Sequence, residues 1–256
     1  MRLANKSIIV TGGGSGIGEG IAKRLAAEGG KIVVNDLNVA GGERVTAEIK
    51  AAGGTALFVK ADVTKDADFK RLVEAAVAAH GGLDSVVNNA GWTHRKKPML
   101  EVTEDEFDRC FNVNTKSIFM CARHAIPQFR AQGKARGGAL INIASTAGVR
   151  PRPGLNVYNA SKGAAILLSK SMALEFGPDN VRVNCVNPVF NPDTALSAEF
   201  AGGAVTPEAR AMFLASIPLG RFSTALDVAN AVLFLASDEG AFVSGVNLEV
   251  DGGRCA

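Results

Sequence analysis

Tyrosine and tryptophan are almost absent from this sequence: among 256 residues there is one Tyr, Tyr158, and one Trp, Trp92. Cysteine is also scarce, and its four residues have neither the paired spacing of a disulfide scaffold nor the spacing of metal ligands. This pattern suits free thiols in a reducing compartment, and we expect no metal site.

The sequence also lacks a strong charge bias and long apolar runs. Its formal net charge is +3, and the basic residues are spread along the chain, which argues against a nucleic-acid binder. No apolar stretch is long enough to span a bilayer, and the run Ile8-Ile9-Val10 is too short for a signal peptide. We therefore expect a soluble cytoplasmic protein with no nucleic-acid or membrane partner.

Short apolar runs alternate with amphipathic segments of helical spacing along the whole chain. This alternation predicts an α/β fold: a single Rossmann-like domain over 1–256, with a doubly wound parallel sheet of about seven strands and helices on both faces. The predicted strands are 7–11, 31–35, 55–60, 85–88, 139–144, 181–186 and 247–250, and the clearest helices are about 17–28, 65–80, 103–132 and 224–236, with another beginning near Tyr158. The irregular region at about 189–216, with helical stretches near 194–200 and 207–214, suits a lid or substrate loop.

A glycine-rich turn joins the first strand to the first helix. Such a turn lets backbone amides approach a pyrophosphate at a helix N-terminus, where the helix dipole favours anions. The predicted cofactor-binding residues here are Gly12, Ser15, Gly16, Ile17 and Gly18.

An acid, Asp36, ends the second strand, where a carboxylate can accept hydrogen bonds from ribose hydroxyls and repel a 2′-phosphate. With Ser15 rather than a basic residue in the glycine-rich turn, this favours NAD over NADP. After the third strand, Asp62 and Val63 are placed to flank an adenine ring. The simpler alternative is that Asp36 and Asp62 only form turns.

Small and amide residues follow the fourth strand, in Asn88-Asn89-Ala90-Gly91. Their small size lets the backbone approach a ligand, and the two Asn side chains can tie the turn to its neighbours. Trp92 and His94 begin the next loop, where they either line a substrate pocket or pack structurally.

Tyr158 and Lys162 are four residues apart in a segment of helical spacing, so they share one helix face. The pKa of a Tyr is ~10, and lowering it to neutral pH needs roughly 4 kcal/mol. One ammonium at about 4 Å in an effective dielectric near 20 supplies about that much. We therefore predict that Lys162 makes Tyr158 a general acid/base. The alternative is an exposed Tyr and Lys on an ordinary helix.

Two further polar residues complete the predicted site. Ser145 ends the fifth apolar run, which places its hydroxyl at a strand's carboxyl end. Asn114 lies in the middle of the predicted helix 103–132 and needs a partner, either an irregular carbonyl or an ordered water.

Together these residues resemble the short-chain dehydrogenase/reductase family across essentially the full chain. The matching motifs are Thr11-Gly12-x-x-x-Gly16-x-Gly18, Asn88-Asn89-Ala90-Gly91, Ser145, Tyr158-x-x-x-Lys162 and Asp251-Gly252-Gly253. The resemblance implies a nicotinamide cofactor, a homotetramer, and an enzyme acting on the CH–OH group of its donor.

The resemblance also implies a role for each residue of the site. Tyr158 exchanges a proton with the substrate oxygen, Lys162 lowers its pKa and binds the nicotinamide ribose, and Ser145 hydrogen-bonds the substrate oxygen. Asn114 holds a water in the proton relay. Cofactor-binding roles also fall on Asn89, Ala90, Gly91, Pro188, Val189 and Thr194.

One departure concerns the loop after the sixth strand, where Pro188-Val189-Phe190 stands in place of the family's frequent Pro-Gly. Val189 can change the backbone path, and Phe190 can narrow the pocket, so Phe190 joins Trp92, His94 and Ser145 as a predicted substrate contact.

The sequence thus predicts an NAD(H)-dependent oxidoreductase acting on a small secondary alcohol or ketone, such as a sugar, polyol or cyclic alcohol. Two alternatives stay open. One is a 3-oxoacyl carrier-protein reductase, which usually prefers NADPH, and the other is a non-catalytic nucleotide-binding regulator.

Overall fold

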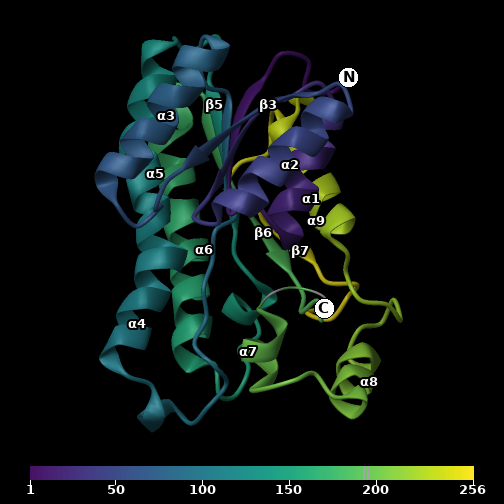
Figure 1. Cartoon of the computed structure of the whole chain (residues 1–256). Coiled ribbons are helices and arrows are strands. Elements are labelled where there is room, and N and C mark those ends of the chain that lie inside the picture. The colour runs from purple at the N-terminus through teal and green to yellow at the C-terminus, as the bar shows by residue number, and fades with distance from the viewer. Residues whose placement is uncertain (193, 195) are drawn as a thin grey trace.

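The computed structural model describes residues 1–192, 194 and 196–256. Its centre is a seven-stranded sheet with the strand order β3-β2-β1-β4-β5-β6-β7, in which every neighbouring pair is parallel. This confirms the predicted doubly wound parallel sheet, and Figure 1 shows helices on both of its sides. The strands are β1 (Ser7–Thr11), β2 (Lys31–Asp36), β3 (Thr55–Lys60), β4 (Ser85–Asn88), β5 (Gly138–Ile143), β6 (Val181–Pro188) and β7 (Asn247–Val250).

The central strands are apolar on both faces because both faces are covered. All five residues of β1 and all four of β4 are buried, as expected for parallel strands between two helical layers. One layer contains α1 (Gly16–Ala27), α2 (Val39–Ala51) and α9 (Ala225–Ala236), whose apolar sides form one core with the sheet. The other contains α3 (Asp66–His80), α5 (Ser117–Ala131) and α6 (Asn156–Phe176), which form a second core.

The predicted helix over 103–132 contains an irregular turn. It begins as α4 (Glu104–Phe111), capped by Thr103 and Glu106, passes through a π-helical turn over Asn112–Lys116, and continues as α5. A π-helical turn inserts one extra residue into a helix and is often found at functional sites. Here the turn contains Asn114.

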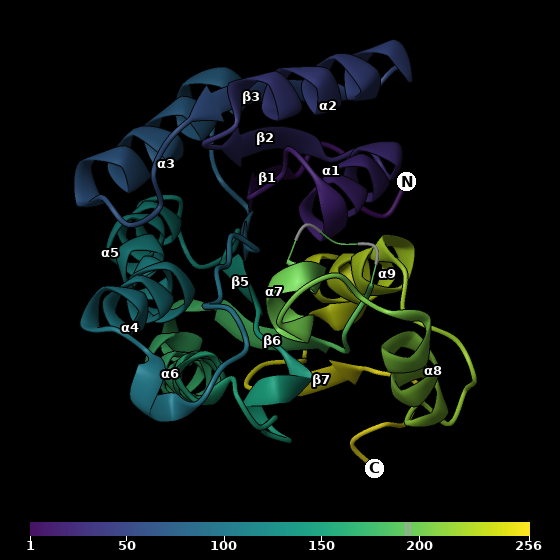
Figure 2. The ribbon, with the colours of Figure 1, turned by 60° about the horizontal axis from the view of Figure 1, so that its bottom comes forward.

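The described residues between β6 and α9 lie beyond the carboxyl ends of the strands. They include α7 (Ser197–Ala201) and α8 (Pro207–Ala215), which Figure 2 shows from that end of the sheet. The short 3₁₀ helices elsewhere are Met99–Glu101, Thr146–Gly148, Gly177–Asp179 and Asp238–Gly240. Among the described residues, no helix is both long and apolar enough to cross a membrane.

Candidate functional site

A cavity of about 390 Å³ lies at the carboxyl ends of the strands. It spans the point where the strand order reverses, between β1 and β4, which is where ligands bind in open α/β sheets. Nearly all residues predicted from the sequence line it: Gly12, Ser15, Gly16, Ile17, Gly18, Asp36, Asp62, Val63, Asn89, Ala90, Gly91, Trp92, Ser145, Tyr158, Lys162, Pro188, Val189, Phe190 and Thr194. Asn114 and His94 are not among the lining residues.

The glycine-rich turn packs so closely against Gly18 that no side chain fits at that position. A Cβ atom on Gly18 would lie 2.0 Å from the carbonyl oxygen of Gly12 and 2.5 Å from Nδ2 of Asn89. Gly12 itself has a φ of +63°, a conformation that L-residues with side chains rarely adopt. Helix α1 begins directly after Ser15, whose side chain makes no capping hydrogen bond, so the first amides of the helix are free to bind an anion.

Asp36 holds the glycine-rich turn next to the end of β2. One carboxylate oxygen accepts the Gly14 N–H at 2.9 Å, and the other accepts the Asn38 N–H at 2.9 Å. Each oxygen keeps further acceptor capacity. The carboxylate therefore fits the ribose-binding role predicted for it.

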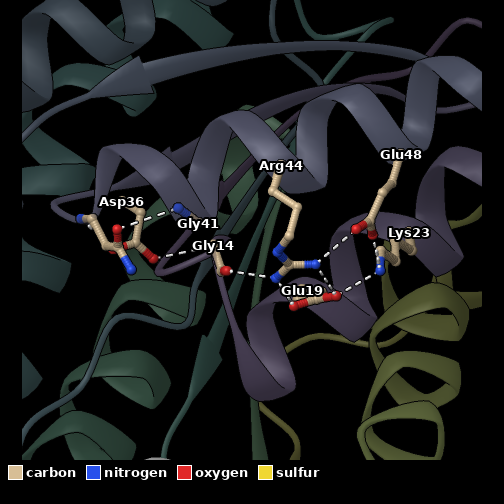
Figure 3. A network of polar contacts seen from close by, with 8 residues as sticks. Gly14, Glu19, Lys23, Asp36, Gly41, Arg44 and Glu48 are labelled. Carbon is tan, nitrogen blue, oxygen red and sulfur yellow. Dashed lines mark hydrogen bonds and ion pairs between the residues drawn. The ribbon is translucent and has the colours of Figure 1, made fainter.

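A cation lies on the other side of Gly14, as Figure 3 shows. Arg44 of α2 donates to the Gly14 carbonyl at 3.2 Å and to both Glu19 and Glu48. Its guanidinium is therefore already paired with two carboxylates. Because a 2′-phosphate would have to compete with Glu19 and Glu48 for Arg44, this arrangement favours the cofactor without that phosphate.

The turn after β4 is tied to the glycine-rich turn by amide hydrogen bonds. Asn89 donates through Nδ2 to the carbonyls of Thr11 and Gly12, and the Thr11 hydroxyl accepts the N–H groups of Asn89 and Ala90. Asn88 bonds Asn142 of β5 at 2.8 Å. The expectation that both Asn side chains tie this turn to its neighbours is confirmed.

Asn114 is buried behind the cavity and almost fully hydrogen-bonded. Its Oδ1 accepts the Trp92 N–H at 2.9 Å, and its Nδ2 donates to the Trp92 carbonyl at 2.8 Å and to Ser161 Oγ at 2.9 Å. The predicted partner, an irregular carbonyl, is thus that of Trp92. One lone pair of Oδ1 stays free for a water.

Ser145 and Tyr158 meet above the end of β5. Burial raises the pKa of Tyr158 to about 12, while a hydrogen bond with Ser145 and the nearby charge of Arg152 act to lower it. The Tyr158 ring packs edge-on against Phe200 of α7, with centroids 5.0 Å apart. The phenol is therefore enclosed between α6 and the segment after β6.

The ammonium of Lys162 is directed toward the end of β5. Its Nζ donates to the carbonyl of Ile143 at 2.9 Å and lies 5.9 Å from the centroid of the Tyr158 ring. Lys162 is not among the groups that lower the pKa of Tyr158 here, because its ammonium is turned toward β5. Burial lowers the pKa of Lys162 itself to about 8.

The segment after β6 continues the sheet before it turns away. The Val189 N–H donates to the carbonyl of Val250, so at this position the chain still follows β7. Phe190 is buried and stacks on Phe213 of α8, with centroids 4.4 Å apart. Thr194 lines the cavity and donates to the carbonyl of Asn191 at 3.1 Å.

His94 was predicted as a substrate contact, but it faces the protein interior. It is 1% exposed, its Nδ1 lies 2.9 Å from the carbonyl oxygen of Arg95, and its ring is not part of the cavity wall. This prediction is wrong for the structure described, because the loop after Trp92 turns the imidazole inward.

Sequence reasoning missed several cavity residues, among them Arg109, Arg152 and Phe200. Arg152 lies between two prolines in the loop that joins Ser145 to Tyr158, and this proximity to both predicted catalytic residues was the available signal. The other two come from α4 and α7, and no local motif marks them.

The residues of the cavity fit a nicotinamide dinucleotide. Free amides at the start of α1 suit the pyrophosphate, Asp36 suits the adenosine ribose, and Asp62 and Val63 lie beside them in the cavity wall. Among the described residues, no cluster of His, Cys, Asp and Glu can hold a metal ion.

Comparisons with known proteins agree with this geometry. A family model described as enoyl-(acyl carrier protein) reductase matches residues 12–254. The chain is 52% identical to a 4-formylbenzenesulfonate dehydrogenase of Comamonas testosteroni, covering 99% of both proteins. It is 40% identical to a 2,5-dichloro-2,5-cyclohexadiene-1,4-diol dehydrogenase of Sphingobium indicum, covering 98% of this chain and 97% of the relative.

A solved structure is also similar. The crystal structure of a 3-ketoacyl-(acyl-carrier-protein) reductase from Brucella melitensis, complexed with NADH, is 42% identical and superposes with a TM-score of 0.92. The match covers 99% of this chain and all of that one. The chain therefore belongs to the short-chain dehydrogenase/reductase family of nicotinamide-dependent oxidoreductases.

Proposed function

We propose that this protein is an NAD-dependent dehydrogenase that acts on the secondary alcohol, or the corresponding ketone, of a small ring compound. The observation that carries this proposal is one cavity with Asp36 at one end and Ser145, Tyr158 and Lys162 at the other. Relatives named for an aromatic aldehyde and for a cyclic diol support a ring-bearing substrate.

The cofactor is NAD rather than NADP. Asp36 presents negative charge where a 2′-phosphate would lie, and Arg44 is already paired with Glu19 and Glu48. The structural relative complexed with NADH supports the same choice. A bound nicotinamide would supply the carbon that accepts the substrate's hydride.

The protein's own residues handle the proton and the substrate oxygen. In the oxidative direction the Tyr158 phenolate takes the hydroxyl proton, and the Ser145 hydroxyl holds the oxygen as it becomes a carbonyl. Positioned proton transfer of this kind contributes roughly 10²- to 10⁴-fold to a rate. Lys162 binds the nicotinamide ribose, and Asn114 holds the water that exchanges protons with the site.

A 3-oxoacyl carrier-protein reductase is the second candidate. It is favoured by the 42% identity to a solved reductase named for that activity. A non-catalytic regulator is less well supported, because the Ser145–Tyr158 hydrogen bond and the buried Lys162 are both intact.

We also propose that the segment 189–216 acts as a substrate lid and that the protein is a cytoplasmic homotetramer. The contact of Phe200 with Tyr158 supports the lid.

Exposed apolar side chains on α4, α5 and α6 support subunit contacts there: Phe107, Phe119, Leu167 and Leu174. The four cysteines are all unpaired, which suits a reducing compartment. Light scattering on the purified protein tests the tetramer.

The function is tested by absorbance at the reduced-nicotinamide band. The enzyme is assayed with sugars, polyols, cyclic alcohols and steroids, using NAD and NADP in parallel. It is also assayed with 3-oxoacyl thioesters, using both reduced cofactors. We expect NAD reduction with ring alcohols. Turnover of thioesters alone, with NADPH, would establish the second candidate instead. No turnover of any substrate, despite tight NADH binding, would favour the non-catalytic regulator.

A further inference from the structure

Arg152 projects into the substrate end of the cavity through a cluster of three phenylalanine rings. Its guanidinium carbon lies 5.5 Å from the ring centroid of Phe190, 5.7 Å from that of Phe200 and 4.6 Å from that of Phe213. Its backbone is fixed as well, because the carbonyl of Arg152 accepts the Asn159 side-chain amide at 2.9 Å. The guanidinium is therefore positioned before any substrate arrives.

This half-buried cation has no anionic partner among the described residues. Within the described part of the chain Arg152 forms no ion pair, and its one side-chain hydrogen bond is a long one, 3.4 Å, to the carbonyl of Phe200. A guanidinium carries five N–H donors, so most of its donor capacity is unused. Burial lowers the pKa of Arg152 to about 10, which leaves the group charged at neutral pH.

The charge of the cavity wall changes sign from one end to the other. Asp36 and Asp62 line the end fitted to the adenosine, whereas Arg109 and Arg152 line the end that contains Tyr158. Arg109 stacks on the Trp92 ring at 4.5 Å. The substrate end is thus both aromatic and cationic, and such an environment favours an aromatic ring that bears a negative charge.

We propose that the substrate is a ring-bearing alcohol or carbonyl compound with a carboxylate or sulfonate group, and that Arg152 binds this group. The planar guanidinium matches two oxygens of either anion. The phenylalanine rings pack on the substrate ring, and the alcohol carbon lies toward Ser145 and Tyr158. This inference rests on the proposed dehydrogenase function and adds its substrate class.

The test compares matched alcohols that differ in one para substituent. Benzyl alcohol and 1-phenylethanol are each used unsubstituted, as the para-carboxylate and as the para-sulfonate, with NAD at neutral pH. For the wild-type enzyme we expect kcat/KM to be at least about 30-fold higher for an anionic member than for its neutral parent. The two anions are measured separately, which shows whether the carboxylate or the sulfonate is preferred.

Variants at Arg152 assign this preference to one side chain. Arg152→Met is expected to remove the advantage of the anionic substrate, mainly through KM. Because the charge of Arg152 also acts on the pKa of Tyr158, the variant can lower turnover of both substrates, and the readout is the ratio of their kcat/KM values. Arg152→Lys retains part of the advantage because it retains the charge. Arg150→Met is the matched control. Arg150 is an exposed arginine of the same loop that donates to the Arg254 carbonyl and lies outside the cavity. We expect kcat/KM for both substrates to be unaffected by this change.

Inhibition of the wild-type enzyme tests the anion site without any variant. We expect 4-toluenesulfonate to compete with the neutral alcohol but not with NAD. Equal turnover of neutral and anionic alcohols, or an advantage that survives Arg152→Met, would overturn this inference and leave the dehydrogenase function standing. If the enzyme oxidised neither these alcohols nor those of the earlier panel, the proposed function would be overturned, and this inference with it.

Discussion

The ammonium of Lys162 donates to the carbonyl of Ile143, at 2.9 Å, two residues before Ser145. This hydrogen bond ties α6, which carries Tyr158, to the end of β5, which Ser145 follows by two residues. Lys162 therefore fixes the relative placement of the phenol and the hydroxyl, whereas the electrostatic role expected from the sequence is not seen in this structure. The pair is positioned by buried contacts rather than by a flexible loop.

Replacing Tyr158 with Phe is the first test of the catalytic assignment. Tyr158→Phe removes only the hydroxyl of a buried ring, so we expect folding and NADH binding to persist while kcat falls at least about 10³-fold. Steady-state turnover and a fluorescence titration with NADH measure the two effects. Turnover within tenfold of the wild-type enzyme would rule out Tyr158 as the acid/base.

Local motifs made much of this site predictable. Asp36 ends β2, and the glycine-rich turn and the turn after β4 follow their strands directly. The carboxyl ends of parallel strands meet at one edge of the sheet, so these residues come together. The pair Tyr158 and Lys162 is similarly local, since four residues place both on one face of α6. These predictions depended on spacing within one element or on the order of elements.

The features that were missed depend on how distant segments pack. Arg152 and Phe200 come together only because the loop after β5 and helix α7 meet over the cavity. The raised pKa of Tyr158 was not foreseen, because desolvation depends on how deeply the ring is buried. The inward turn of His94 and the π-helical turn at Asn114 likewise arise from tertiary contacts that periodicity does not contain.

The pH dependence of turnover follows from the pKa of Tyr158. Because burial raises this pKa to about 12, the phenolate is a minor species at neutral pH, and its fraction grows up to tenfold per pH unit. Alcohol oxidation needs the phenolate, so we expect kcat/KM for oxidation to rise from pH 7 to pH 10, whereas ketone reduction, which needs the neutral phenol, does not. Profiles in both directions check this, and a flat oxidation profile would contradict it.

Cofactor preference is tested by removing the charge of Asp36 while keeping its size. We expect Asp36→Asn to shift the ratio of kcat/KM values for NAD and NADP by at least about tenfold toward NADP, because the repulsion of the 2′-phosphate is lost. Asp105→Asn, which neutralises an exposed acid on α4, serves as the control and should leave the ratio unchanged. An unchanged ratio in Asp36→Asn would mean that residues other than Asp36 discriminate between NAD and NADP.

Gly18 is predicted to tolerate no side chain. A Cβ atom there would lie 2.0 Å from a backbone oxygen, and moving that oxygen displaces the glycine-rich turn. We expect Gly18→Ala to abolish NADH binding and to lower the Tm. Gly177→Ala is the matched control, since Gly177 has a φ of −54° and no atom within 4 Å of a Cβ, so it should bind NADH normally. Normal binding by Gly18→Ala would show that the turn can open without loss of function.

The cluster of Glu19, Lys23, Arg44 and Glu48 gives a prediction about stability. The hydrogen bond from Arg44 is the main cause that holds the pKa of Glu19 at about 2, below its usual 4.5, against the opposing effect of burial. A carboxylate with a lowered folded-state pKa stabilises the protein above its unfolded-state pKa and loses that contribution as the pH falls toward the folded-state value. The window here is about pH 4.5 to 2.

Glu19→Gln should therefore lower the free energy of unfolding at pH 7 by about 1 kcal/mol, after allowance for solvent screening at this partly exposed site. The difference from wild type should shrink below pH 4.5, as urea titrations at several pH values will measure. Glu43→Gln, at an exposed position of α2, is the control and should match the wild type throughout. A deficit in Glu19→Gln that stayed constant down to pH 2 would mean that packing, rather than the charge of Glu19, stabilises this junction of α1 and α2.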